Sequence, residues 1–259
     1  MSQKNKITPA QLRGTVLKMV YSKSSGHIGA SFSIAEIITV LYNLYDIPDT
    51  DKLILSKGHA VPIIYAALYH LGRLSLKDLV TFRECDSKLQ GHPDKLLMPE
   101  LTATTGSLGQ GLSIAIGHAI AMRKLGKPGK VFCILGDGEM QEGQVWEALM
   151  SVPSFDIPNL TVILDRNYAQ NEGETIFNQT YYSIPSFLSR SWRFKQIEGN
   201  NLKDVEDTFT PKTSSKPTFI TANTKKAAGI SFMEGKPEWH GKVPTLEELS
   251  MGLKELGVV

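Results

Sequence analysis

The sequence of 259 residues has little cysteine, no long apolar run and no excess of either charge. Only Cys85 and Cys133 occur, so no disulfide framework is expected, and Cys133 within the apolar run 131–135 is predicted to be a small core residue. No stretch approaches the roughly 18 apolar residues that a membrane-spanning helix needs. The 28 basic and 26 acidic side chains leave no positive surplus for a nucleic-acid backbone or an anionic membrane surface. We therefore expect neither a nucleic acid nor a membrane as a partner.

The N-terminal segment also lacks the pattern of a secretory signal. Residues 1–13 are polar and carry Lys4 and Lys6 with no apolar segment behind them, which predicts a cytoplasmic protein. Fixed-period repeats and low-complexity tracts are missing, and their absence argues against a solenoid. The length itself allows one large domain or two small ones, with a core that needs no disulfide or metal to hold it.

Apolar periodicity predicts helices that alternate with short strands. Capping-box patterns begin at Thr8 and Ser33 and precede amphipathic stretches, and further helices are predicted over residues 59–71, 108–125 and 142–152. Apolar runs of the length of buried strands occupy residues 53–55, 130–135, 160–164 and 218–222. This alternation predicts an α/β fold, a doubly wound and mostly parallel sheet with helices on both faces. A long loop over residues 225–242 and a final helix beginning after Thr245 complete the chain.

The strongest chemical signal follows two of the predicted strands. Gly136-Asp137-Gly138 comes after the strand 130–135, and Asn167 comes shortly after the strand 160–164. Ligands of open α/β sheets bind outside the carboxyl ends of neighbouring strands, so both segments can face one crevice. Aspartate and asparagine oxygens suit a hard divalent cation whose remaining ligands are a diphosphate, a backbone carbonyl and water. Taken alone, Gly-Asp-Gly is equally typical of an ordinary turn after a strand.

Four histidines stand beside small residues, namely His27, His59, His92 and His240. A single histidine is more often a satisfied structural residue than a functional one. Four such contexts favour imidazoles presented to a ligand, because a neighbouring glycine removes the bulk that would block access.

A glycine-rich segment, residues 104–111, opens the predicted helix 108–125. Such a helix N-terminus can bind an anion or let a flat ring approach the backbone. The familiar nucleotide-binding patterns are absent: there is no Gly-x-x-x-x-Gly-Lys-Ser/Thr, and Gly109-x-Gly111 lacks the third glycine and the preceding strand of the dinucleotide-binding motif.

Together these motifs resemble the N-terminal section of transketolase. The matching stretches agree in order and spacing over residues 27–241, and they are residues 55–60, 91–93, 105–111, 136–138 with Asn167, and 239–241. In particular the chain resembles the N-terminal subunit of split transketolases, in which the diphosphate-binding domain and the remainder are separate polypeptides. The resemblance implies a single thiamine diphosphate-binding domain over residues 1–259, with the loop and C-terminal helix of residues 225–259 as its tail.

The resemblance also implies roles for individual residues. Asp137, Asn167 and the backbone carbonyl of Ala169 would hold Mg²⁺ or Ca²⁺ on the diphosphate of thiamine diphosphate. Cofactor contacts are implied for His59, Gly106, Ser107, Leu108, Gly136, Asp137, Gly138, Glu139, Asn167 and His240. His27, His92 and His240 would bind sugar hydroxyls and shuttle protons while a two-carbon ketol unit passes from a ketose or ketose phosphate to an aldose. Glu142 matches a carboxylate that links two active sites near the family's dimer interface, although the favourable charge at a helix N-terminus explains it equally well.

A second polypeptide is implied as well. In this family a glutamate of a separate pyrimidine-binding domain activates the cofactor, and residues 1–259 contain no such domain. We therefore expect a C-terminal partner subunit, an α2β2 heterotetramer, and no transketolase activity in this chain alone. One departure from the family is Ala227-Ala228 in place of the usual glycines, which is expected to alter the path of the loop that carries His240.

Two other functions are compatible with parts of the pattern. The α subunit of a 2-oxo acid dehydrogenase also binds thiamine diphosphate through Gly-Asp-Gly and asparagine, but the four histidine contexts favour sugar chemistry. A non-catalytic regulatory subunit is the other alternative, and the intact Asp137 and Asn167 argue against it.

Overall fold

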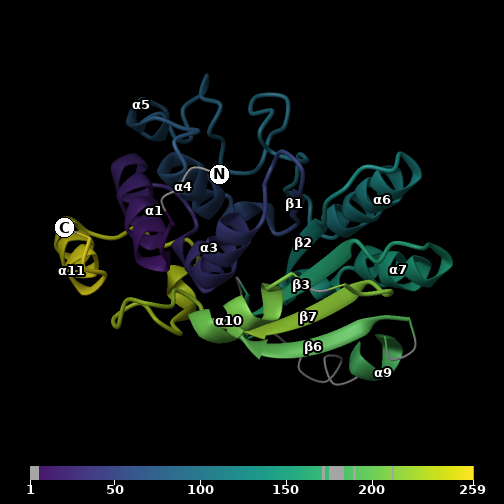
Figure 1. Ribbon diagram of the computed structural model, residues 1–259. Coiled ribbons are helices and arrows are strands. Elements are labelled where there is room, and N and C mark those ends of the chain that lie inside the picture. The colour runs from purple at the N-terminus through teal and green to yellow at the C-terminus, as the bar shows by residue number, and fades with distance from the viewer. Residues whose placement is uncertain (1–5, 171–172, 175–183, 189–190, 212, 259) are drawn as a thin grey trace.

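The central feature of the computed structural model is a sheet of five parallel strands (Figure 1). The structure describes residues 6–170, 173–174, 184–188, 191–211 and 213–258. In spatial order the strands are β1 (Lys52–Leu55), β2 (Val131–Gly136), β3 (Leu160–Arg166), β7 (Thr218–Asn223) and β6 (Arg193–Glu198). A separate antiparallel pair consists of β4 (Ala169–Gln170) and β5 (Gly173–Glu174). The predicted parallel α/β architecture is confirmed.

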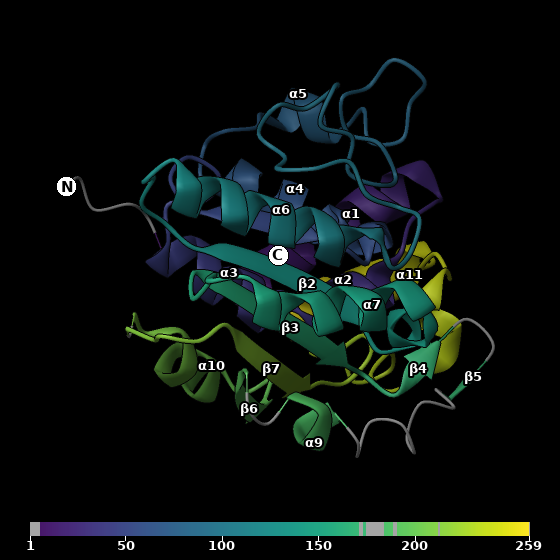
Figure 2. The same ribbon diagram turned by 90° about the vertical axis from the view of Figure 1, so that its right-hand side faces the viewer.

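Helices cover both faces of this sheet, as Figures 1 and 2 show. The helices of eight or more residues are α1 (Pro9–Lys23), α3 (Ala35–Leu44), α4 (Pro62–His70), α6 (Gln110–Lys124), α7 (Gly143–Ser151), α10 (Leu202–Phe209) and α11 (Leu246–Glu255). Shorter ones are α2 (Ile28–Ser33), α5 (Leu76–Leu79) and α9 (Ile184–Leu188). Among the described residues no helix combines the length and the apolar character that crossing a bilayer requires.

Side chains of the central strands alternate between two apolar layers. In β2, Phe132 and Ile134 belong to the layer that contains α1, α3 and α4, whereas Cys133 and Leu135 pack with α6 and α7. This alternation follows from the two-residue period of a strand. Cys133 is fully buried, so its prediction as a small core residue is confirmed.

The two predicted capping boxes have different outcomes. At α1 the Thr8 hydroxyl accepts a hydrogen bond from the backbone of Gln11, as predicted. The prediction at Ser33 is wrong, because this residue ends α2, and α3 begins at Ala35 with no side-chain cap. Both polar side chains of the expected capping box instead bind residues that are distant in the sequence: Ser33 donates to Asp165, and Glu36 pairs with Arg13.

Element boundaries and one edge of the sheet also differ from the sequence prediction. The predicted helix 59–71 consists of a single 3₁₀ turn (Gly58–Ala60) followed by α4, and the predicted helix 108–125 begins only after Gly109, whose φ is 85°. Strand β6 was not predicted, because as an edge strand it buries only the side chain of Ile197 completely and so has no continuous apolar run.

The segment predicted as a long loop, residues 225–242, packs firmly against the helical layer. Ala227, Ile230, Met233 and Trp239 are buried, and residues 237–240 form a 3₁₀ turn. Ala227 does have a left-handed backbone, with φ of 53°, held in part by the hydrogen bond from its N–H to the carbonyl of Gly29. The tail then ends in α11, which packs against α1.

A buried ion pair joins α1 to α3. The Arg13 guanidinium donates to both carboxylate oxygens of Glu36 at 2.7 and 2.8 Å and to the carbonyl of Phe32 at 2.9 Å. Both side chains are almost completely buried, at 6% and 8% exposure. A charge in such a place is costly unless its partner is present.

Removing one member of this pair is therefore expected to destabilise the fold strongly. Glu36→Ala leaves the Arg13 charge buried without its carboxylate and should lower the free energy of unfolding by about 3–5 kcal/mol. The matched control is Glu84→Ala, which breaks the exposed pair with Lys23 and should cost less than about 1 kcal/mol. Urea denaturation followed by circular dichroism measures both, and equal losses would contradict this assignment.

Candidate functional site

A pocket of about 420 Å³ lies at the carboxyl ends of the strands. It is lined by Lys57 after β1, by Asp137 after β2, by Asn167 after β3 and by Lys226 after β7. The predicted site residues found in its wall are His27, His59, His92, Gly106, Leu108, Gly136, Asp137, Gly138, Glu139, Asn167 and His240. The parallel strands and their loops therefore bring together residues that are far apart in the sequence.

The four predicted histidines form one cluster. The ring centroid of His27 lies 5.3 Å from that of His59, 5.2 Å from that of His240 and 6.4 Å from that of His92. Despite the left-handed Ala227 on its loop, His240 also lies 5.3 Å from His59.

These histidines are uncharged at neutral pH. Burial, followed by the charges of Arg83, His92 and Lys226, lowers the pKa of His27 to about 4. Burial and the charges of Lys226, His27 and Lys57 likewise lower the pKa of His240 to about 4. The pKa of His59 is lowered well below its usual value, mainly by burial. A neutral imidazole can accept a proton as well as donate one, which is what proton transfer near neutral pH needs.

Asp137 and Asn167 are brought together by an unusual turn. The carboxylate of Asp137 accepts hydrogen bonds from the backbone of Gly138 at 2.9 Å and of Tyr168 at 2.7 Å. Tyr168 makes this contact with a left-handed backbone, φ 62°, and its ring lies 4.5 Å from the Arg166 guanidinium carbon. The strained residue thus lies directly beside the predicted ligand Asn167.

The side-chain oxygens of Asp137 and Asn167 can bind a divalent cation only if a bound ligand supplies additional oxygens. Within the described residues no group of three or more histidine, cysteine, aspartate or glutamate side chains is placed to hold a metal ion. Asp137 and Asn167 are therefore insufficient alone, and Mg²⁺ or Ca²⁺ would take further oxygens from a backbone carbonyl, a bound diphosphate and water. The predicted carbonyl donor, Ala169, opens β4 two residues after Asn167.

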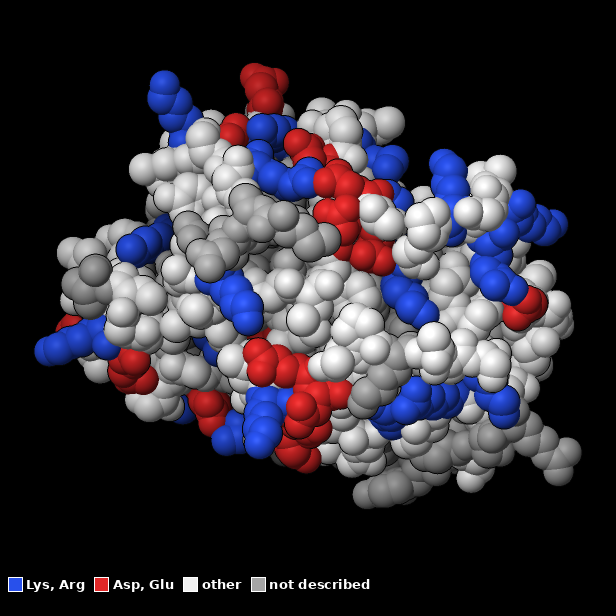
Figure 3. Space-filling model, viewed as in Figure 1, with Lys and Arg blue, Asp and Glu red and all other residues white. Residues whose placement is uncertain are grey.

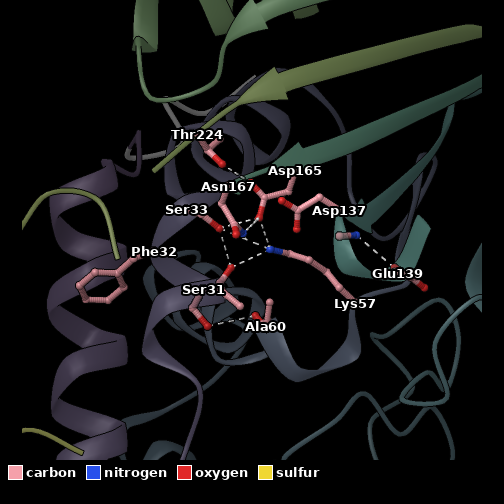
Figure 4. A network of polar contacts seen from close by, with 12 residues as sticks. Ser31, Phe32, Ser33, Lys57, Ala60, Asp137, Glu139, Asp165, Asn167 and Thr224 are labelled. Atoms are coloured by element: carbon pink, nitrogen blue, oxygen red, sulfur yellow. Dashed lines mark hydrogen bonds and ion pairs between the residues drawn. The ribbon is translucent and has the colours of Figure 1, made fainter. Parts of the chain in front are cut away.

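Beneath the pocket, Lys57 and Asp165 form a buried ion pair that Figure 4 shows at the centre of a polar network. Lys57 Nζ lies 2.5 Å from Asp165 Oδ2 and also donates to the carbonyl of Ala30 at 2.9 Å. The pair crosses from the end of β1 to the end of β3. Because β2 lies between these strands, the ion pair spans the end that carries Asp137.

Lys226, which no sequence motif indicated, supplies a buried amine to the pocket. Only 1% of this residue is exposed, and burial lowers the pKa of its amine to about 8, with Lys57 adding to the shift and Asp137 opposing it. Its Nζ, the Nδ1 of His27 and the Nδ1 of His240 are buried without a hydrogen-bond partner in the described structure. In the sequence, the only indication was that Lys226 follows a predicted strand, and lysines are common at such positions. An ammonium group without a partner in a buried pocket suits an anion.

Glu139 lines the pocket, and its carboxylate is held by hydrogen bonds from the chain itself. Its carboxylate accepts hydrogen bonds from Ser56 Oγ at 2.5 Å, Gly109 N at 2.8 Å and Gly136 N at 3.1 Å. Burial raises its pKa, and these three hydrogen bonds oppose the rise. Glu139 therefore holds the glycine-rich segment against the end of β2.

Two predicted residues whose side chains the structure describes lie outside the wall of the pocket, namely Ser107 and Glu142. Ser107 is exposed. Glu142 is an exposed N-cap residue of α7 that makes no side-chain cap, so both of its interpretations stay open.

Basic and acidic side chains are interspersed over the described surface seen in Figure 3, with no continuous basic field on that face.

The chain matches the family model described as "Transketolase, thiamine diphosphate binding domain" over residues 4–258. It is similar to a subunit of the apulose-4-phosphate transketolase of Actinobacillus succinogenes, with 38% identity over 94% of this chain and 92% of that protein. It is also similar to the 6-deoxy-6-sulfo-D-fructose transketolase subunit SqwG of Clostridium sp. (strain MSTE9), with 34% identity over 95% of this chain and 93% of that protein.

Longer transketolases match over a part of their length. The transketolase structure from Campylobacter jejuni superposes with a TM-score of 0.87 and 31% identity over 96% of this chain, which spans 42% of that chain. Human transketolase is 35% identical, and this chain spans 39% of it. In extent the chain therefore corresponds to the shorter relatives, which are named as transketolase subunits.

The lowered histidine pKa values predict a loss of stability in acid. In the unfolded chain a histidine titrates near a pKa of about 6.5, whereas the pKa of His27 and of His240 in the folded chain is about 4. Between these values the unfolded state binds more protons, so the free energy of unfolding falls as the pH falls. Urea denaturation across this pH range should show a shallower decline for His240→Gln than for the unchanged chain. Parallel declines would count against the shifted pKa.

Proposed function

Because the chain belongs to the family of transketolase thiamine diphosphate-binding domains, we propose that it is the cofactor-binding subunit of a two-chain transketolase. It would bind thiamine diphosphate with Mg²⁺ and transfer a two-carbon ketol unit from a ketose donor to an aldose acceptor. The observation that carries this proposal is one pocket whose wall contains Asp137, Asn167, four neutral histidines and Lys226, whose amine has no hydrogen-bond partner in the described structure.

The pocket offers acceptor oxygens to the cation of a metal diphosphate and hydrogen-bond donors to its phosphate groups. Asp137 and Asn167 offer oxygens to the cation, whereas Lys226 and the N–H groups of His59 and His240 offer donors to the phosphate oxygens. Gly106 and Leu108 form the part of the wall that a flat ring can approach. When bound, thiamine diphosphate supplies the nucleophilic carbon that carries the two-carbon unit.

The histidines then act on the sugar. His27, His92 and His240 would bind substrate hydroxyls, and their neutral imidazoles can take a proton from a hydroxyl and return it. Names of two relatives mention apulose 4-phosphate and 6-deoxy-6-sulfo-D-fructose, which are both sugars with an anionic group. A sugar or sugar phosphate is accordingly the proposed donor.

A C-terminal partner subunit is the second part of the proposal. The relatives that this chain matches along nearly their whole length are named as subunits, whereas it spans about two-fifths of single-chain transketolases. The partner would supply a pyrimidine-binding domain with the activating glutamate and substrate contacts, in an α2β2 assembly. Leu108, which is 37% exposed at the pocket wall, is a suitable apolar contact for that partner.

Calorimetry tests the cofactor site directly. Thiamine diphosphate with Mg²⁺ is titrated into this chain alone and into its mixture with the candidate partner subunit. We expect binding that strengthens with the partner and that is largely lost in Asp137→Ala, because that variant removes a metal ligand. No binding under any of these conditions, with folded chains, would instead support a non-catalytic regulatory role.

Lys226 is expected to contribute to recognition of the diphosphate. Removing its charge in Lys226→Met should weaken binding of thiamine diphosphate by about tenfold or more, since a hydrogen bond to a charged group contributes about 1.5–3 kcal/mol. Thiamine, which has no phosphate, is the matched control ligand and should bind both proteins equally. Equal weakening for the two ligands would show that the substitution damages the pocket in general.

Catalysis is expected to need both chains. The chain alone should show no ketol transfer, and addition of the partner should restore it from ketose phosphate to aldose. Activity in the highly purified single chain would contradict the two-chain proposal. Decarboxylation of pyruvate by the reconstituted pair, in place of ketol transfer, would identify the α subunit of a 2-oxo acid dehydrogenase.

A further inference from the structure

We propose that Asp165 is a positioning residue that determines which way the amide of Asn167 faces. This inference rests on the proposed function, in which Asn167 is a ligand of the cation. Asp165 is completely buried and lies outside the pocket wall, so it would touch neither the cofactor nor the substrate. It does contact Asn167, however, because its Oδ2 accepts a hydrogen bond from Asn167 Nδ2 at 2.9 Å.

The direction of this hydrogen bond matters because an asparagine amide has two ends of nearly the same shape. Only the oxygen can ligate a cation, whereas the NH₂ group is a donor that a cation repels. An ionised carboxylate accepts hydrogen bonds and donates none, so Asp165 attracts the NH₂ end and repels the oxygen. With Nδ2 turned toward Asp165, the planar amide directs its oxygen away from Asp165.

The Asp165 carboxylate is itself held in place by hydrogen-bond donors from several elements. Its Oδ2 accepts from Lys57 Nζ at 2.5 Å and from Ser33 Oγ at 2.7 Å, and its Oδ1 accepts from the Thr224 hydroxyl. These residues come from the end of β1, from α2 and from the residue after β7. Figure 4 shows the donors converging on Asp165 with Asn167 beside it. All members of the network belong to this chain, so the network itself can set the amide before a cation arrives.

Preset orientation of a ligand strengthens metal binding, since partners behind the ligands typically contribute 10–100-fold in affinity, as an order of magnitude. The same network also has a structural role that could explain Asp165 without any effect on the metal. Distinguishing these two roles requires two variants that carry the same charge and differ only in whether they offer an acceptor to Asn167.

Asp165→Asn and Asp165→Leu form such a matched pair. Both remove the negative charge and both leave Lys57 without its counter-ion. In Asp165→Asn, however, the Lys57 ammonium group attracts the oxygen of the new amide, so this oxygen takes the position of Oδ2. There the oxygen can still accept a hydrogen bond from Asn167 Nδ2. Asp165→Leu has a similar volume and no acceptor. A difference between these variants therefore reports the orientation of Asn167 and not the charge.

The first readout is the Mn²⁺ affinity of the chain with its partner and thiamine diphosphate, measured by electron paramagnetic resonance. We expect Asp165→Leu to weaken Mn²⁺ binding by about 10–100-fold and Asp165→Asn by less than about threefold. Equal losses in both variants, or no loss in Asp165→Leu, would overturn the proposal. Thr221→Val, which removes a buried hydroxyl of β7 that has no hydrogen-bond partner in the described structure, is a control for general damage and should stay close to the unchanged chain.

The second readout needs neither metal nor cofactor, so it separates this inference from the proposed function. In nuclear magnetic resonance spectra of the chain alone, the Asn167 Nδ2 protons should exchange slowly with water, and this protection should persist in Asp165→Asn and disappear in Asp165→Leu. Fast exchange in the unchanged chain would overturn the inference even where metal binding is normal. If Asp165→Leu does not fold, Lys57→Met/Asp165→Leu replaces it, because it leaves no buried charge.

Discussion

The buried ion pair between Lys57 and Asp165 is the interaction on which the geometry of the site depends. It joins the ends of β1 and β3 across β2, and both side chains are excluded from water, at 2% and 0% exposure. Two isolated charges in such a place would be prohibitively costly, but here each has several further hydrogen bonds. The pair therefore constrains the three strand ends that carry Lys57, Asp137 and Asn167.

Above this pair the pocket contains buried nitrogen atoms without hydrogen-bond partners in the described structure, from Lys226, His27 and His240. Burial lowers the pKa of His59 and of Lys226, because an environment shielded from water disfavours the charged form. A diphosphate would relieve that cost and bring with it the oxygens that Asp137 and Asn167 need to complete a cation site. On the proposed function, a diphosphate cofactor and its metal ion are therefore expected to bind together.

Residues that carry a local motif were predictable from the sequence, and residues defined only by their neighbours were not. Gly136-Asp137-Gly138 and Asn167 follow apolar strands, so their common edge could be inferred from the strand pattern. Ser33 was predicted as a helix cap because its local pattern is that of one, yet its hydroxyl donates to Asp165, 132 residues away. Lys226 gave no usable signal, because a lysine after a strand is normally exposed.

The sequence by itself determined the parallel α/β fold, the strands that end at the site, and the histidines, Asp137 and Asn167 that meet there. These follow from local periodicity and from glycine contexts, which act over a few residues. Only the tertiary structure decided that Glu139 binds the chain, that Lys226 is a buried cation, and that Asp165 faces the amide of Asn167. Burial and hydrogen-bond direction depend on residues brought together from distant parts of the chain, and no local pattern contains that information.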